Sequence, residues 1–80
     1  DMSNLNVIEK GLVVPVIISE LREHPDGMTL EEIRRALTTK GIGKTRDRLI
    51  EICAVFCSIR RNHDEIRYVP NGELYPVIIH

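Results

Sequence analysis

The stretch from Lys40 to Arg61 decides the fold of this 80-residue chain and reads KGIGKTRDRLIEICAVFCSIRR. Two glycines near its start are typical of a turn, and the basic segment from Lys44 to Arg48 follows them. Apolar side chains then recur at i, i+3, i+4 and i+7, the spacing of one face of an α-helix. These residues are Leu49, Ile52, Cys53 and Phe56. The stretch therefore predicts a glycine-hinged loop that leads into a helix with a basic first turn, the usual form of a recognition helix.

One helix is expected near the start of the chain. Pro15 is tolerated in a first helical turn, so the apolar pattern from about Leu12 predicts a helix that ends near His24. Pro25 disfavours helical geometry in the residue before it. The residues from Asp1 to Lys10 are weakly patterned and are expected to form a lead-in.

The clearest helix start in the chain is Thr29-Leu30-Glu31-Glu32, which has the form of a capping box. The Thr29 hydroxyl is expected to accept a hydrogen bond from the Glu32 N–H, and the Glu32 carboxylate to accept one from the Thr29 N–H. A short second helix is therefore expected between this motif and the glycine-hinged loop.

Two extended segments follow the third helix. Residues 57–61 and 66–69 flank the turn-like sequence Asn62-His63-Asp64-Glu65, which predicts a hairpin. Residues 74–79 form one more extended segment, which Pro76 restricts to an edge or a tail. Three helices, a β-hairpin wing and an extended C-terminal segment make a small α+β winged helix-turn-helix fold. A single domain is expected over residues 1–80, with its core at about 12–79.

Composition argues against several classes of protein. A chain with no Trp and one Phe has room for one core of Leu, Ile and Val, so a deep catalytic cleft is not expected. We therefore expect no enzyme, no cofactor and no small-molecule substrate. The longest apolar patch, Leu12 to Ile18, is too short for a membrane span. Because no signal peptide is recognisable and only two cysteines occur, an intracellular protein of the cytoplasm or nucleus is expected.

The net charge is −1, but the charges are unevenly distributed. Residues 1–39 carry four Lys or Arg against seven Asp or Glu, whereas residues 40–80 carry seven against five. The expected partner is RNA or DNA, bound modestly and in a salt-dependent manner through its phosphates, with Tyr68 able to stack on a base. The candidate nucleic-acid-binding residues are Lys40, Lys44, Thr45, Arg46, Arg48, Arg60, Arg61, Arg67 and Tyr68.

Two local patterns suggest other chemistries. The residues from Thr38 to Thr45 end like a nucleotide-binding P-loop, but Thr38 stands where the motif needs a glycine. A zinc set could be imagined from Cys53, Cys57, His63 and His80. The spacing of these residues lacks the usual two-residue knuckle, and buried free thiols explain the cysteines. We expect no metal site and no catalytic residue.

Protein interaction is the alternative function. The near-neutral charge and the apolar C-terminal segment favour it, since an edge segment can pair with another chain. The partner would be a second copy of the chain or, as the family resemblances described below imply, a helicase or a component of the transcription machinery. The candidate interface residues are Leu74, Tyr75, Val77, Ile78 and Ile79.

The segments Glu23–Glu32 and Phe56–Pro70 give the chain a resemblance to LOTUS domains, small winged helices of germline RNA-granule proteins. The shared features are an HPDG turn before a short helix and a wing of the form φxIxR…φxVYP. The resemblance covers about residues 12–70 and implies the minimal type, which is associated with RNA, including G-rich structures. The chain departs from the family at residues 38–43, which replace a longer aromatic-bearing segment.

A second resemblance involves Met28-Thr29-Leu30-Glu31-Glu32-Ile33, which is similar to LTLDEI in the winged helices of transcription factor IIE. This likeness implies duplex DNA and contacts with the polymerase machinery.

Overall fold

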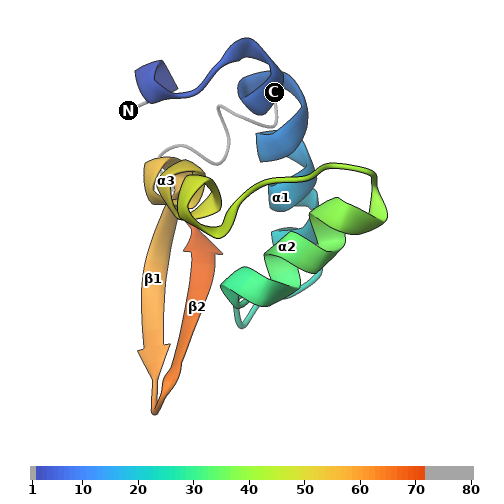
Figure 1. Cartoon of the computed structure of the whole chain (residues 1–80). Helices are drawn as coiled ribbons and strands as arrows, with labels where there is room; N and C mark the ends of the chain where they lie inside the picture. Colours follow the sequence, from blue (N-terminus) through green and yellow to red (C-terminus); the bar gives the residue numbers. More distant parts are fainter. Residues whose placement is uncertain (1, 72–80) are drawn as a thin grey trace.

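The computed structural model describes residues 2–71 and shows three helices followed by an antiparallel hairpin (Figure 1). The helices are α1 (Val14–Arg22), α2 (Leu30–Thr39) and α3 (Arg46–Phe56), and the strands are β1 (Cys57–Asn62) and β2 (Glu65–Pro70). A short 3-10 helix, Met2–Asn4, and a π-helical turn, Glu9–Val13, precede α1. The expected α+β class and the order of three helices before a hairpin are confirmed. The extended segment expected at residues 74–79 lies outside the described residues.

Helical structure begins earlier than the apolar pattern indicates. Residues 7–22 form one helical run, in which the π turn Glu9–Val13 leads directly into α1. The expectation of a lead-in from Asp1 to Lys10 is therefore wrong. Asn6 Oδ1 accepts a hydrogen bond from the Glu9 N–H at 2.8 Å, and Glu9 Oε1 accepts one from the Asn6 N–H at 2.9 Å. This is the reciprocal arrangement of a capping box, with Asn6 in the place of Ser or Thr.

The capping box predicted for α2 is confirmed. The Glu32 N–H donates to Thr29 Oγ1 at 3.2 Å, and the Thr29 N–H donates to Glu32 Oε1 at 2.8 Å. Met28 and Ile33, which flank these two residues, are both buried. Their burial on either side of the cap fits a hydrophobic staple, which fixes the angle at which the chain enters the helix.

The hairpin pairs Cys57 with Pro70 at its base and Asn62 with Glu65 at its tip. A third extended position lies on the free side of β2, because Met28 and Tyr68 exchange two backbone hydrogen bonds of 3.0 and 2.7 Å. Gly27 makes this close approach possible. Its φ is 91°, and a β-carbon there would lie 2.8 Å from the Tyr68 carbonyl oxygen.

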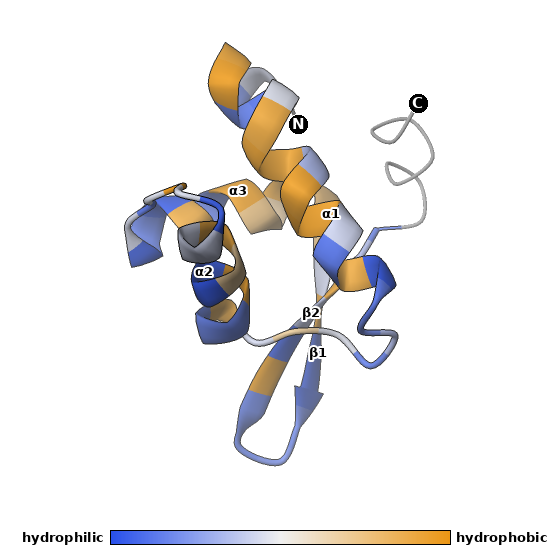
Figure 2. Cartoon of the chain, turned by 90° about the vertical axis from the view of Figure 1, so that its right-hand side faces the viewer, coloured by the Kyte–Doolittle hydropathy of each residue, from blue (hydrophilic) through white to orange (hydrophobic). Residues whose placement is uncertain are grey.

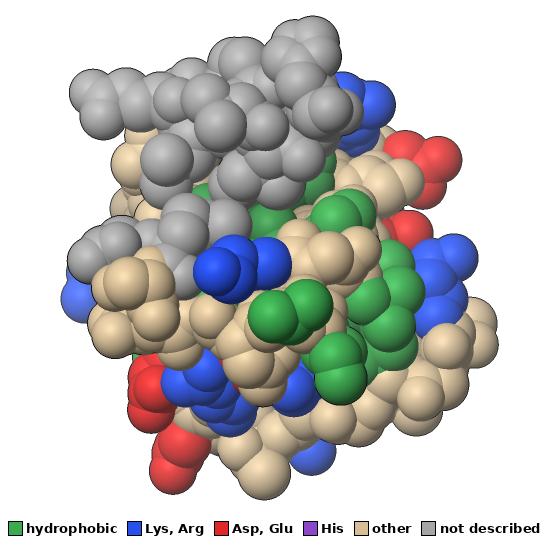
Figure 3. Space-filling view, turned by 90° about the horizontal axis from the view of Figure 1, so that it is seen from above, with side chains coloured by type: hydrophobic (Ala, Val, Ile, Leu, Met, Phe, Trp, Pro, Cys, Tyr) green, Lys and Arg blue, Asp and Glu red, His purple; other side chains and the backbone are tan. Residues whose placement is uncertain are grey.

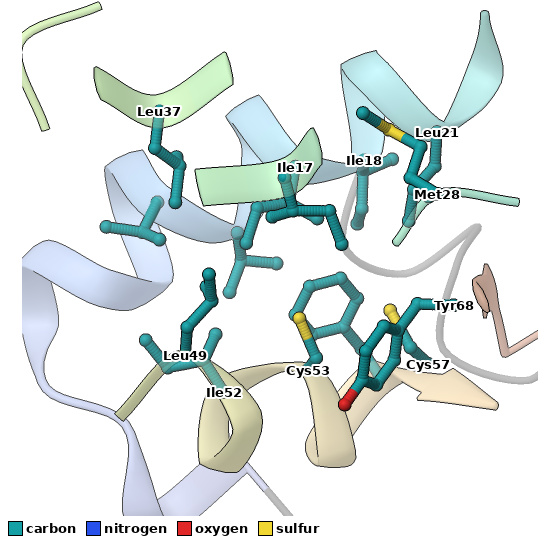
Figure 4. Close-up of a cluster of buried hydrophobic side chains, with 14 of the residues drawn as sticks. Ile17, Ile18, Leu21, Met28, Leu37, Leu49, Ile52, Cys53, Cys57 and Tyr68 are labelled. Carbon is teal, nitrogen blue, oxygen red and sulfur yellow. The ribbon is translucent and has the colours of Figure 1, made fainter. Parts of the chain in front are cut away.

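The core lies between the three helices and the base of the hairpin (Figures 1 and 4). Figure 2 shows hydrophobic residues concentrated along α1, whereas the hairpin is mostly hydrophilic. The side chains that fill the core include Ile17, Ile18, Leu21, Ile33, Leu37, Leu49, Ile52 and Phe56. Burial of one such side chain contributes about 1.5–3 kcal/mol. Among the described residues, none of the helices combines the length and the apolar character needed to cross a membrane.

Candidate nucleic-acid interface

Lys44 and Arg48, at the start of α3, hold the carboxylate of Glu9. Lys44 Nζ lies 3.0 Å from Glu9 Oε2, and Arg48 donates from Nε to Oε2 at 2.8 Å and from Nη2 to Oε1 at 2.6 Å. Only 1% of Glu9 is exposed, so this is a buried carboxylate with two cationic partners. The hydrogen bonds from Arg48 hold the pKa of the Glu9 carboxyl well below its usual range, against the opposing effect of burial.

Arg48 has further partners in addition to Glu9. Its Nη1 donates to Glu51 at 2.8 Å, and its Nη2 donates to the backbone carbonyl of Asn4 at 2.8 Å. The hydrogen bonds to Glu9, and after them the one to Glu51, raise the pKa of the guanidinium against the opposing effect of burial. The structure therefore places Lys44 and Arg48 in an ion-pair network inside the chain, and their charges are balanced by Glu9 and Glu51.

Thr45 is the N-cap residue of α3. Its hydroxyl oxygen accepts a hydrogen bond from the Arg48 N–H at 3.2 Å. This bond satisfies one of the backbone donors that a helix leaves unpaired at its start. A structural role is thus sufficient to explain a threonine at this position.

Arg67 is also held within the chain. It forms an ion pair with Glu65, donates from Nη1 to the Gly27 carbonyl at 2.9 Å and lies 3.5 Å from Glu32 Oε1. Glu65 is the main cause of a raised pKa at Arg67. The contacts tie β2 to the turn before α2, so Arg67 has an evident structural function.

Tyr68 belongs to the core and not to the exposed surface. Its side chain packs beside Cys53 and Cys57 (Figure 4), and only 7% of the residue is exposed. Burial raises the pKa of its hydroxyl, while the nearby charge of Arg46 acts in the opposite direction. The expectation that Tyr68 is placed to stack on a base is therefore corrected: the side-chain alternation of β2 directs it into the protein.

The remaining candidate cations are exposed and form no ion pair with the described part of the chain; they are Lys40, Arg46, Arg60 and Arg61. The hairpin register separates the last two. Arg60 is opposite Arg67, whereas Arg61 is opposite Ile66 on the same face as Ile59 and Tyr68.

We define the wing face as Ile59, Arg61, Ile66 and the edge of Tyr68. Ile59 is 54% exposed and Ile66 is 42% exposed, so two apolar side chains flank an arginine on this surface. Arg46 is the exposed first residue of α3, and its charge opposes the rise in the pKa of the Tyr68 hydroxyl. The nine residues predicted for one site are thus dispersed: Arg61 shares a face of the hairpin with Tyr68, and Arg46 is exposed at the start of α3.

The opposite face of the hairpin carries a polar hollow of about 380 Å³ lined by Asp26, Arg60, Asn62, Glu65 and Arg67. Two cations and two anions line it, so this face has no clear preference for a charged ligand. Lys40 is the C-cap residue of α2, so it belongs to a different element from the wing face.

The cysteines offer no reactive group. Cys53 and Cys57 are free and buried, and the contact between the two thiols, together with burial, raises the pKa of Cys57. Across the described ranges, no three His, Cys, Asp or Glu side chains gather in a way that could hold a metal ion. His80 and the candidate interface residues of the C-terminal segment lie outside the described part of the chain. Those residues are Leu74, Tyr75, Val77, Ile78 and Ile79.

Sequence reasoning did not identify Glu9 as the partner of the α3 cations. A signal for its helix start was present, since Asn6 and Glu9 have the spacing of a capping box. The partners themselves are 35 and 39 residues away, which no local pattern reveals.

Comparison of the chain with protein-family models, with curated proteins and with solved structures finds no match.

Proposed function

We propose that this chain is a winged-helix binding module that contacts the phosphates of a nucleic-acid strand with Arg46 and the wing face. The element order supports the fold assignment. A short extended position at Met28 lies between α1 and α2, and α3 leads into the hairpin, which gives the helix, strand, helix, helix, hairpin order of a winged helix.

The observation that carries the functional proposal is the exposure of Arg46 at the start of α3 and of Arg61 on the wing face. Both guanidinium groups lack an ion-pair partner within residues 2–71, whereas Lys44, Arg48 and Arg67 each have one. A guanidinium that is already exposed binds a phosphate without first breaking an internal contact. Ile59 and Ile66 supply apolar surface for sugars or bases beside these contacts.

The proposed binding is modest and depends on salt. The outer surface of α3 carries Asp47 and Glu51, both exposed, which oppose close approach of phosphates to the centre of the helix. Two phosphate contacts give a slope of about −1.4 to −1.8 in a plot of log affinity against log salt, at about 0.7–0.9 for each contact. Lys40 and Arg60 add to the general attraction of the strand without belonging to the same face.

The test is a titration of labelled RNA and labelled duplex DNA at two salt concentrations, with the wild type and the double variant Arg46→Glu, Arg61→Glu. The proposal expects binding to at least one of the two nucleic acids in low salt, and loss of that binding in the double variant. A matched control is Lys10→Glu with Arg35→Glu, which makes the same charge change at two exposed positions away from the wing face. Equal affinity of the two double variants would contradict the proposal.

A second candidate function is protein docking, which is favoured by exposed apolar side chains on the N-terminal helical run. Val7 is 82% exposed, Ile8 67% and Leu12 49%. Figure 3 shows hydrophobic side chains gathered at the surface on the face seen from above. Light scattering of the wild type and of Ile8→Ser tests the dimer form of this function, which predicts a larger particle for the wild type alone.

For both candidate functions, the two free thiols fit a reducing compartment such as the cytoplasm or nucleus.

A further inference from the structure

Glu9 is an unusual residue to find in the core of a small domain. Carboxylates are rarely buried to this extent unless they are paired. Between residues 3 and 12, only Leu5 and Glu9 are buried, while the side chains around them are exposed. The N-terminal segment contacts the domain through the buried side chain of Leu5, the ionic contacts of Glu9 and the hydrogen bond from Arg48 to the Asn4 carbonyl.

The two cations that hold Glu9 are arranged as an anion-binding site. Arg48 binds the carboxylate with two parallel N–H···O bonds of 2.8 and 2.6 Å, and Lys44 adds a third contact at 3.0 Å. A guanidinium fork of this type binds a carboxylate or a phosphate with the same geometry. The first turn of α3 lies beside it and contributes its positive dipole end.

We propose that Glu9 occupies, within the chain, an anion site formed by Lys44 and Arg48, and that release of Glu9 opens this site to a phosphate group. Only one anion can satisfy the fork of Arg48 at a time. The N-terminal segment is thus an internal competitor of phosphate, and the phosphate affinity of the site depends on how often Glu9 leaves it.

The geometry of the N-terminal segment is compatible with such opening. The turn that carries Glu9 is a π turn, a form that is rare in proteins and frequent at functional sites. Gly11 lies inside this turn, and a β-carbon at this position would have no neighbour within 4 Å. Movement of the segment must break the contacts of Leu5 and Glu9 and the hydrogen bond from Arg48 to the Asn4 carbonyl.

The site is also accessible from solvent once the carboxylate has moved. The side chains of Lys44 and Arg48 are 20% and 31% exposed, so both cations border the surface while Glu9 lies beneath them. Arg48 in addition lines a hollow of about 310 Å³ together with Asn4, Leu5, Glu51, Ala54 and Val55. A phosphate that enters from this side meets the guanidinium beside Glu51, which accepts a hydrogen bond from Arg48 Nη1 at 2.8 Å.

This inference goes beyond the proposed function, which Arg46 and Arg61 carry without release of Glu9, and it is tested without a nucleic acid. The probe is inorganic phosphate, and the readout is the shift of backbone amide signals in NMR spectra of the 80-residue chain. Glu9→Gln keeps the volume of the side chain and removes its charge. The variant is expected to bind phosphate roughly tenfold more tightly than the wild type, with the largest shifts at residues 44–48.

The control is Glu9→Gln combined with Lys44→Gln, which removes one cation of the site. This double variant is expected to return to weak phosphate binding. Equal phosphate affinity of the wild type and a folded Glu9→Gln variant would overturn the proposal. Shifts confined to residues outside the start of α3 would do the same.

A second measurement uses the wild type alone and does not depend on the folding of a variant. Phosphate that binds the open site must increase the open population, so hydrogen exchange at the amides of residues 6–10 is expected to accelerate in phosphate buffer. Chloride at equal ionic strength is the reference. Equal exchange in the two buffers would overturn the proposal.

These outcomes separate the two proposals. Loss of nucleic-acid binding in the Arg46 and Arg61 variant tests the wing face and does not involve Glu9. If that variant binds as well as the wild type, the proposed function fails, while the phosphate titration still decides whether Lys44 and Arg48 form an anion site.

Discussion

The carboxylate of Glu9 lies 2.6 and 2.8 Å from two nitrogens of Arg48, which is 39 residues later in the chain. This pair joins the N-terminal helical run to the start of α3. It also divides the basic residues of the chain into two groups, because Lys44 and Arg48 are neutralised internally while Arg46 remains exposed. The exposed group is the one that can bind a phosphate without a structural change.

Removal of the Glu9 carboxylate is expected to destabilise the domain. Glu9→Ala leaves two cations facing each other beside a cavity, and loss of one partner of a fully buried pair costs about 3–5 kcal/mol. Because Lys44 and Arg48 are partly exposed, a smaller loss of roughly 2–3 kcal/mol in the free energy of unfolding is expected. Urea denaturation measures it. Glu31→Ala, which removes an exposed carboxylate 3.7 Å from Arg34, is the control and should cost less than about 1 kcal/mol.

The same carboxylate makes stability depend on pH in a defined direction. The pKa of Glu9 is lowered by folding, so the unfolded chain binds its proton more readily than the folded chain does. Its contribution is complete above the unfolded pKa of about 4.3 and is lost as the pH falls below that value. Unfolding measured at several pH values from 6 down to 3 should therefore show a steeper loss of stability for the wild type than for Glu9→Gln. Parallel curves for the two proteins would contradict this assignment.

Substitution of Gly27 and of Gly11 by alanine is expected to change the stability of the domain in opposite directions. Gly27→Ala places a methyl group 2.8 Å from the Tyr68 carbonyl oxygen at a φ of 91°, so a loss of about 1–3 kcal/mol is expected. Gly11→Ala adds a methyl group with no neighbour within 4 Å inside a helical turn, and a gain of about 0.5–1 kcal/mol is expected. Thermal unfolding of both variants tests the difference. A Gly27→Ala protein as stable as Gly11→Ala would show that the close approach of the turn to β2 is not important.

Thr45 is expected to act through its cap and not through its methyl group. Thr45→Ala removes the acceptor for the Arg48 N–H and should cost about 1 kcal/mol, whereas Thr45→Ser keeps the acceptor and should cost much less. Denaturant unfolding of the two variants distinguishes them. An equal loss in both would indicate that the hydroxyl does not stabilise α3.

Local signals allowed α1, α2, α3 and the hairpin to be predicted, but not the helical turn that precedes α1. The capping box at Thr29 and Glu32 and the apolar face of α3 depend on residues within a few positions of each other, so their sequence spacing is informative. The bridge between Met28 and Tyr68 could not be predicted in this way, because it depends on how the turn after α1 meets β2. The candidate site was predicted least well, because the partners of its cations come from distant parts of the chain.

The buried position of Tyr68 could also not be predicted from local sequence spacing. Alternation along a strand identifies two faces, but the sequence does not state which face meets the core. The buried Cys53 of α3 and Cys57 of β1 lie on the side that receives Tyr68, and this packing determines the outward face of the wing. Arg61, and not Arg60, consequently lies on the face of the hairpin that carries Tyr68.

The central claim is that exposed cations, and not internally paired ones, carry the binding of nucleic acid. The most direct measurement compares Arg46→Gln with Lys44→Gln, each of which removes one positive charge at the start of α3, in a titration of the same labelled RNA and duplex DNA over a range of salt. Arg46→Gln is expected to lower the affinity and to reduce the salt slope by about 0.7–0.9, whereas Lys44→Gln is expected to leave both nearly unchanged because Glu9 already neutralises Lys44. Equal effects of the two substitutions, or a larger effect of Lys44→Gln, would contradict the account.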